Sequence, residues 1–89
     1  MHNLLVEKID ETHFQASIQH NTTTQHMVTV PTAYALKLTD GKVSTEQLVK
    51  KYFELILARE PNTSILRSFE LSVIGHYFPE YEREIKRML

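Results

Sequence analysis

The chain has 89 residues, 42% of them hydrophobic and 24% charged, and its formal net charge at neutral pH is −1. These values exclude a disordered chain and predict one globular domain, residues 1–89, with a thin core. The absence of cysteine excludes disulfides, thiolate metal ligands and a thiol nucleophile.

Two strands are predicted near the N-terminus. Apolar and polar residues alternate over residues 4 to 9, and they do so more regularly at Phe14, Ala16 and Ile18. A period of two places the apolar side chains on one face of a strand. The polar residues 10 to 12 suit a short turn, so the two strands are predicted to form a hairpin.

A third strand is predicted after a polar tract. Residues 21 to 25 are asparagine, threonine and glutamine, a composition and a length that favour a five-residue hairpin loop. Closing this loop with His20 opposite His26 places Ile18 opposite Val28 and Ala16 opposite Val30. Apolar residues of both strands then face the same side, so we predict this register.

Pro31 interrupts the third strand, because proline cannot donate a hydrogen bond to a sheet. The alternation resumes beyond it, at Tyr34, Leu36 and Leu38. The sequence therefore predicts a three-stranded antiparallel meander whose third strand is kinked or split at the proline.

A long helix is predicted next. Ser44 and Gln47 have the spacing of a capping box, and the helix is expected to span about residues 45 to 59, since Pro61 disfavours helical geometry at Glu60. At 100° per residue its apolar side chains cover an arc of about 200°, wider than one contact surface requires. The arc contains Leu48, Val49, Tyr52, Phe53, Leu55, Ile56 and Leu57.

Such a wide arc must be covered on two sides. The C-terminal segment or a second subunit could supply the second cover. If a second subunit does so, the expected interaction surface is the outer part of the arc near Phe53 and Leu57, because leaving these side chains in water forgoes roughly 1.5 to 3 kcal/mol each.

One or two shorter helices are predicted to follow. Residues 64 to 77 have mostly helical apolar spacing and predict a short buried helix. Pro79 suits the first position of a final helix, with acidic residues in its first turn and Lys86 and Arg87 in its last. Together these elements predict an α+β domain in which the meander packs on the long helix.

No catalytic, metal-binding or cofactor-binding residue is predicted. His20 and His26 are two metal ligands at most, fewer than zinc normally takes. No Ser, Asp or Glu lies at a fixed spacing from His76 to act with it in base catalysis. Glu80, Glu82 and Glu84 fan around a helix axis, so they do not form a paired carboxylate site. The chain is therefore not expected to be an enzyme.

The charge pattern gives weak support for nucleic-acid binding, because the basic residues are scattered and the net charge is near zero. The best basic group is Lys37, Lys42, Lys50 and Lys51, with Tyr34 and Tyr52 available for base stacking. The longest apolar run is four residues, against the roughly 20 that cross a bilayer, and no basic apolar leader is present.

The sequence therefore predicts a small cytoplasmic protein-interaction or regulatory module, with a protein partner or a second copy of the chain as its ligand. A weak nucleic-acid-binding domain is the alternative. A metal-binding or enzymatic protein that uses its histidines is a more remote one.

Overall fold

The computed structural model describes residues 3–19 and 22–89 and confirms the α+β class and the antiparallel meander. One sheet has the strand order β1-β2-β3-β4, in which β4 adds to the meander in parallel beside β3. The elements in chain order are β1 (Asn3–Lys8), β2 (His13–Gln19), β3 (Thr23–Thr29), α1 (Thr32–Thr39), α2 (Thr45–Leu57), the 3-10 helix η1 (Asn62–Ser64), β4 (Ser68–Glu70), α3 (Leu71–Tyr77) and α4 (Pro79–Met88).

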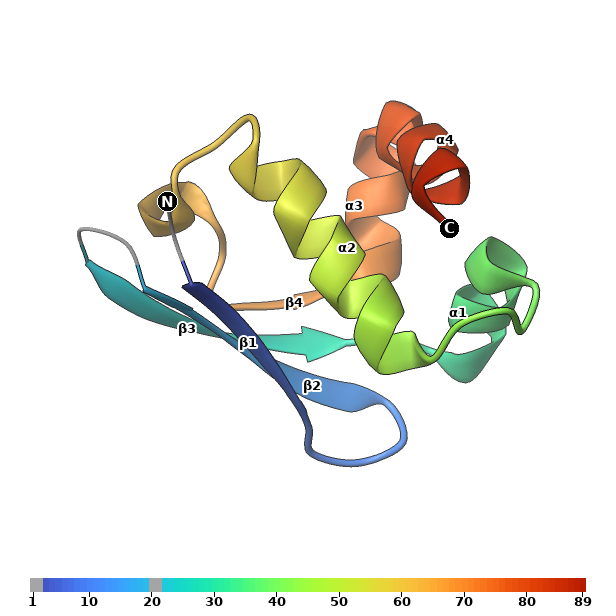
Figure 1. Cartoon of the computed structure of the whole chain (residues 1–89), viewed down its shortest axis with the longest axis horizontal. Helices are drawn as coiled ribbons and strands as arrows, with labels where there is room; N and C mark the ends of the chain where they lie inside the picture. The colour runs from blue at the N-terminus through green and yellow to red at the C-terminus, as the bar shows by residue number, and fades with distance from the viewer. Residues whose placement is uncertain (1–2, 20–21) are drawn as a thin grey trace.

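The core lies between one face of the sheet and α2, which crosses that face (Figure 1). Phe14, Ala16 and Ile18 on β2 and Val28 on β3 are fully buried there, while the residues between them are at least partly exposed. The alternation in the sequence therefore selects the buried face of the sheet.

The predicted register of β2 and β3 is wrong. Val28 pairs with Phe14 and His26 with Ala16, so the partner on β2 lies four residues earlier than predicted. Thr23 and Thr24, which were assigned to the loop, belong to β3, because β-branched side chains suit a strand. A shift by an even number of residues keeps every side chain on its predicted face. His20 lies outside the described residues.

The predicted continuation of the third strand beyond Pro31 is also wrong, because residues Thr32–Thr39 form α1. Ala35, Leu38 and Thr39 are buried and Leu36 is exposed, which is helical spacing. Tyr34, Leu36 and Leu38 fit a period of two only because the segment is short. Asp40 ends the helix in the left-handed conformation, with φ of 53°, and its N–H donates to the Leu36 carbonyl.

The long helix begins as predicted and ends two residues early. The Ser44 hydroxyl accepts the Gln47 N–H at 3.2 Å, and the helix runs over Thr45–Leu57. Its wide apolar arc is covered on two sides, since α2 contacts β1 and β2 of the sheet and also α1 and α4. The C-terminal segment thus supplies the second cover within one chain.

The segment predicted as one buried helix over residues 64 to 77 contains the end of η1, the short strand β4 and α3. Three residues are too few for a period-two pattern to be recognised in β4. Parallel pairing with β3 requires a crossover, and α1 and α2 provide it. The final helix, α4, begins at Pro79 as predicted. No helix among the described residues is long and apolar enough to cross a membrane.

Candidate functional site

An apolar groove of about 350 Å³ lies beside the C-terminal end of α2. Five parts of the chain meet there, namely α2, the segment after η1, β4, α3 and the start of α4. Its apolar lining includes Ile56, Ile65, Leu66, Phe69, Ile74 and Phe78. Leu66 is 69% exposed and Phe78 is 51% exposed, so large apolar surface faces solvent at the groove.

A buried hydrogen-bond network fixes the wall that carries Leu66. The Asn62 amide donates to the Thr22 carbonyl at 2.8 Å and to the Thr24 hydroxyl at 2.9 Å. His26 Nδ1 lies 2.7 Å from the Leu66 carbonyl, and its Nε2 lies 2.9 Å from the Thr24 hydroxyl. A carbonyl only accepts, so Nδ1 carries a proton, and in the neutral ring Nε2 then accepts from the Thr24 hydroxyl.

This network ties the backbone of Leu66 to β3 while its side chain remains in solvent. Asn62 and His26 are buried, at 4% and 1% exposure. Both ring nitrogens of His26 and the amide nitrogen of Asn62 have hydrogen-bond partners. The next residue is held as well, because the Arg67 carbonyl accepts the Met27 N–H at 2.7 Å. The exposed apolar surface therefore belongs to a fixed wall and not to a frayed loop.

The opposite wall is formed where α3 gives way to α4. Pro79 disfavours helical geometry in the residue before it, and Phe78 accordingly leaves the helix with φ of −130° and ψ of 75°. Its ring packs 5.7 Å from that of Tyr81, centroid to centroid. The Arg59 guanidinium lies 4.9 Å from the centroid of the Tyr81 ring, and Tyr81 is one of the residues that line the groove.

A separate polar cluster joins α1, α2 and α4. The Tyr34 hydroxyl donates to Glu82 Oε2 at 2.9 Å and lies 3.3 Å from the Tyr52 hydroxyl. Tyr34 has one proton to give, so Tyr52 donates to Tyr34. Burial raises the pKa of Tyr34 and raises that of Tyr52 to about 12, which keeps both hydroxyls protonated.

Gly75 of α3 packs against this cluster. A Cβ atom at this position would lie 2.5 Å from the Tyr34 hydroxyl and would also clash with the Glu82 carboxylate. A shallow polar hollow next to it includes Lys37, Ser72 and His76. Because the Glu82 carboxylate is already engaged by Tyr34, we assign the cluster to the packing of the three helices.

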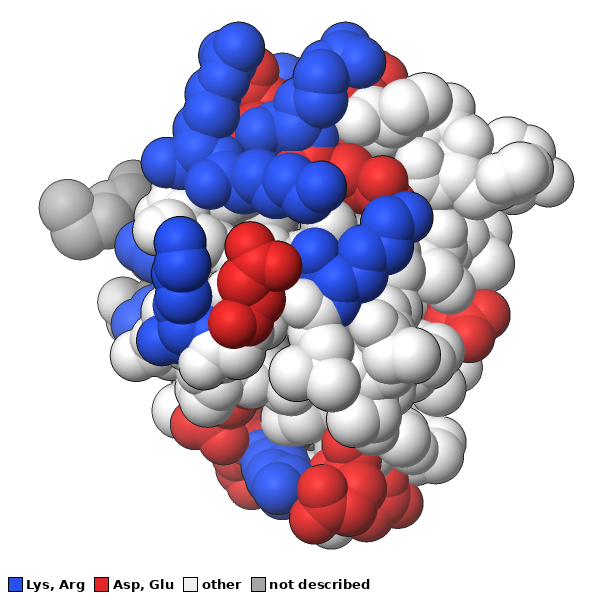
Figure 2. Space-filling model, turned by 90° about the vertical axis from the view of Figure 1, so that its right-hand side faces the viewer, with Lys and Arg blue, Asp and Glu red and all other residues white. Residues whose placement is uncertain are grey.

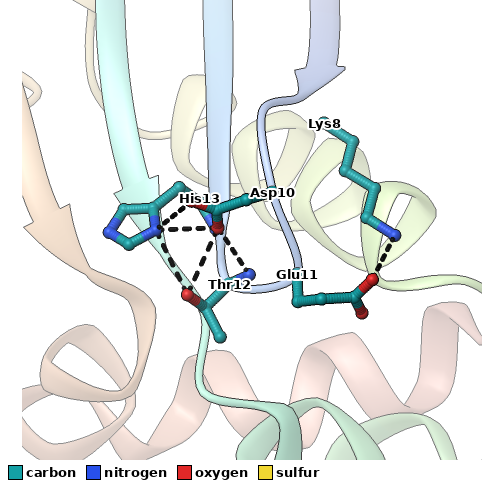
Figure 3. A network of polar contacts seen from close by, with 5 residues as sticks. All are labelled: Lys8, Asp10, Glu11, Thr12 and His13. Carbon is teal, nitrogen blue, oxygen red and sulfur yellow. Dashed lines mark hydrogen bonds and ion pairs between the residues drawn. The ribbon is translucent and has the colours of Figure 1, made fainter.

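The turn between β1 and β2 contains a second polar network (Figure 3). Asp10 Oδ1 accepts the backbone N–H groups of Thr12 and His13, both at 2.9 Å, and contacts His13 Nδ1 at 2.9 Å. The Thr12 hydroxyl lies 3.1 Å from the same Nδ1 atom. A catalytic relay needs the carboxylate and the nucleophile on different ring nitrogens, so this network closes a turn.

The Asp10 network makes folding stability depend on pH. The Thr12 N–H and the His13 side chain, in that order, favour the charged carboxylate and lower the pKa of Asp10 from 3.8 to about 2. A lowered folded-state pKa contributes stability that is present above about pH 4 and lost as the pH falls towards 2. We therefore expect Asp10→Asn to be less stable than the wild type near neutral pH, with the difference disappearing near pH 2.

Urea denaturation at a series of pH values would measure this difference. Glu7→Gln, on the exposed side of β1, controls for the loss of one negative charge. A destabilisation by Asp10→Asn that stays constant from pH 7 to pH 2 would contradict the assignment.

The structure separates the residues singled out in the sequence. Phe53 is fully buried between His26 and Phe69, so it has no surface to offer a second subunit in the folded chain. Leu57 is partly buried and packs on the core. Neither lines the groove. The described residues contain no group of three or more potential metal ligands, and His26 is held by Thr24 and Leu66.

The sequence pattern did not predict the groove, because residues 64 to 77 were expected to form one short buried helix. The sequence did contain a signal. More large apolar residues lie around Pro79 than a single short helix can bury. Comparisons with protein-family models, curated proteins and solved structures found no match to this chain.

Proposed function

We propose that this domain is a protein-interaction module that binds an apolar segment of a partner protein in the groove between α2, β4, α3 and α4. The observation that carries the proposal is the rigid exposure of Leu66, whose backbone is fixed by buried His26 while its side chain stands in solvent. Large apolar surface held open in this way is typical of interaction sites.

The composition of the groove also favours a protein partner. Aromatic side chains and arginine are enriched where interfaces have their strongest contacts, and Phe78, Tyr81 and Arg59 meet here. Tyr77, 71% exposed at the end of α3, adds apolar surface one residue before Phe78. A preformed site avoids part of the entropy cost of binding.

A selection from a random 16-residue peptide display library tests the proposal. We expect enriched peptides to bind the wild-type domain at least tenfold more tightly than the Phe78→Ser variant, since losing one central aromatic contact typically costs 2 kcal/mol or more, about a 30-fold change in affinity. Leu36→Ser, which removes an exposed apolar side chain of α1 outside the groove, is the matched control. Peptides that bind wild type and Phe78→Ser equally would refute the proposal.

The same variants separate a binding role from a role in folding. Because Leu66 and Phe78 are largely exposed, we expect Leu66→Ser and Phe78→Ser to change the free energy of unfolding by less than about 1 kcal/mol, close to the range of ordinary surface substitutions. Urea denaturation measures this change. A loss of several kcal/mol would instead make these residues part of the core.

Light scattering on the purified domain decides whether the partner is a second copy. Two identical concave grooves do not fill each other in a twofold contact, so a segment of a different protein suits the groove better. A dimer that Phe78→Ser converts to a monomer would instead identify the second copy as the ligand.

Nucleic-acid binding remains the second candidate, on the strength of the surface charge. Lys and Arg gather on the upper part of one face, on the side of α4, and Asp and Glu gather at its lower end (Figure 2). This polarity accompanies a net charge of only −1. We expect single-stranded RNA or DNA to bind with a dissociation constant weaker than about 10⁻⁶ M at physiological salt. A submicromolar, salt-sensitive anisotropy change would reverse this ranking.

A further inference from the structure

We infer that the partner segment carries a carboxylate beside its apolar anchors, and that Arg59 selects it. This inference rests on the proposed function and adds the chemistry of the ligand. It would explain why an exposed arginine lies against Tyr81, an aromatic residue of the groove.

Arg59 is placed by the end of α2 and by an aromatic ring. Its backbone N–H donates to the Ile56 carbonyl at 2.9 Å at the end of α2, and Ile56 itself lines the groove. Its guanidinium lies 4.9 Å from the centroid of Tyr81, another lining residue. The cation is therefore held against the ring of a residue that lines the groove.

The guanidinium is available to a ligand. In the described part of the chain, no Asp or Glu oxygen lies within 4.0 Å of Arg59, whereas Arg87 of α4 is paired with Glu84 at 3.6 Å. Contact through the face of a guanidinium leaves its N–H groups free at the edge. Such a fork matches a carboxylate in a bidentate pair, which an ammonium group cannot form.

Two neighbouring charges modify the site. Arg67, exposed and directly after the lining residue Leu66, adds a second positive charge near the rim. Glu60 lines the groove and opposes a carboxylate ligand. Arg67 and Glu60 offset each other, and Glu70 and Glu80 also lie next to lining residues in the sequence. The preference for a carboxylate therefore rests on Arg59 itself and not on the net charge of the rim.

Two biased peptide display libraries test the inference. Both have 16 residues with randomised apolar residues at the same helical positions, and their flanking positions are fixed as Glu in one library and Gln in the other. We expect the best Glu peptides to bind wild type about tenfold more tightly than their Gln counterparts, measured by fluorescence anisotropy.

Variants assign the preference to Arg59. We expect Arg59→Gln to remove the preference for Glu, Arg59→Lys to restore only part of it, and Glu60→Gln to increase the affinity for Glu peptides. Lys50→Gln, which removes an exposed cation from the first half of α2 and away from the groove, should leave the preference unchanged.

The outcomes distinguish the two proposals. Glu and Gln peptides that bind equally, and lose binding equally in Phe78→Ser, would overturn the role of the carboxylate and leave the proposed function standing. Failure of both libraries to yield peptides dependent on Phe78 would overturn the proposed function and the inference together. If a single-stranded oligonucleotide displaced the bound Glu peptide, and if this displacement depended on Arg59, phosphate would be the ligand and the inference would be overturned.

Discussion

Phe53→Ala is expected to lower the free energy of unfolding by about 3 to 5 kcal/mol, the range for removing a buried aromatic side chain. Phe53 is fully buried on α2, with its ring centroid 5.7 Å from that of His26 and 6.0 Å from that of Phe69. The truncation would leave a cavity where α2 meets β3 and β4. Ile56→Ala, one turn later, is expected to cost about 2 to 5 kcal/mol.

Urea denaturation followed by circular dichroism measures both changes. Leu36→Ala is the control, because its side chain on α1 is 57% exposed and its removal should cost about 0.5 kcal/mol or less. An unchanged denaturation midpoint for Phe53→Ala would show that α2 does not pack on the sheet as described. The free energy of unfolding of a whole domain is usually about 5 to 15 kcal/mol, so the loss expected for Phe53→Ala would be a large fraction of it.

Asn62→Ala is expected to destabilise the domain by about 1 to 3 kcal/mol, because it leaves buried polar groups without their partner. The Asn62 amide connects η1 to the Thr22 carbonyl and the Thr24 hydroxyl, and that hydroxyl in turn donates to His26. Loss of the amide should also loosen the groove wall. Amide hydrogen exchange at Met27, whose N–H donates to the Arg67 carbonyl, should become faster.

Thr63→Ala is the matched control for this prediction, because Thr63 is the next residue of η1 and is exposed. It should leave both the denaturation midpoint and the exchange at Met27 nearly unchanged. If Asn62→Ala destabilised the fold without changing that exchange rate, the network would stabilise the domain without fixing the groove wall.

The elements that the sequence predicted correctly are those with a local physical cause. Phe14, Ala16 and Ile18 alternate over a full strand, and Ser44 caps α2 through the Gln47 N–H three residues later. Pro79 starts α4 because a missing N–H costs nothing at a first helical position. The apolar arc of α2 also predicted that a second layer must cover this helix.

Where two local patterns fit equally well, the sequence could not choose between them. The spacing of Tyr34, Leu36 and Leu38 suits a strand, yet Ala35, Leu38 and Thr39 suit the helix that forms. The threonines before Gln25 suit a loop or a strand, and this uncertainty shifted the predicted register by four residues. Both alternatives bury apolar residues, so only packing against α2 and β4 decides.

The sequence by itself determined the α+β class, the order of most elements and the need to cover α2 on two sides, because hydrophobic period, capping and proline act within a few residues. The groove was decided by tertiary structure alone. Its wall depends on hydrogen bonds from Asn62 and His26 to residues 38 to 40 positions away in the chain, and β4 exists because β3 offers it an edge. Contacts over such separations leave no periodic signal, so Leu66 and Phe78 looked like core residues until the fold placed them in solvent.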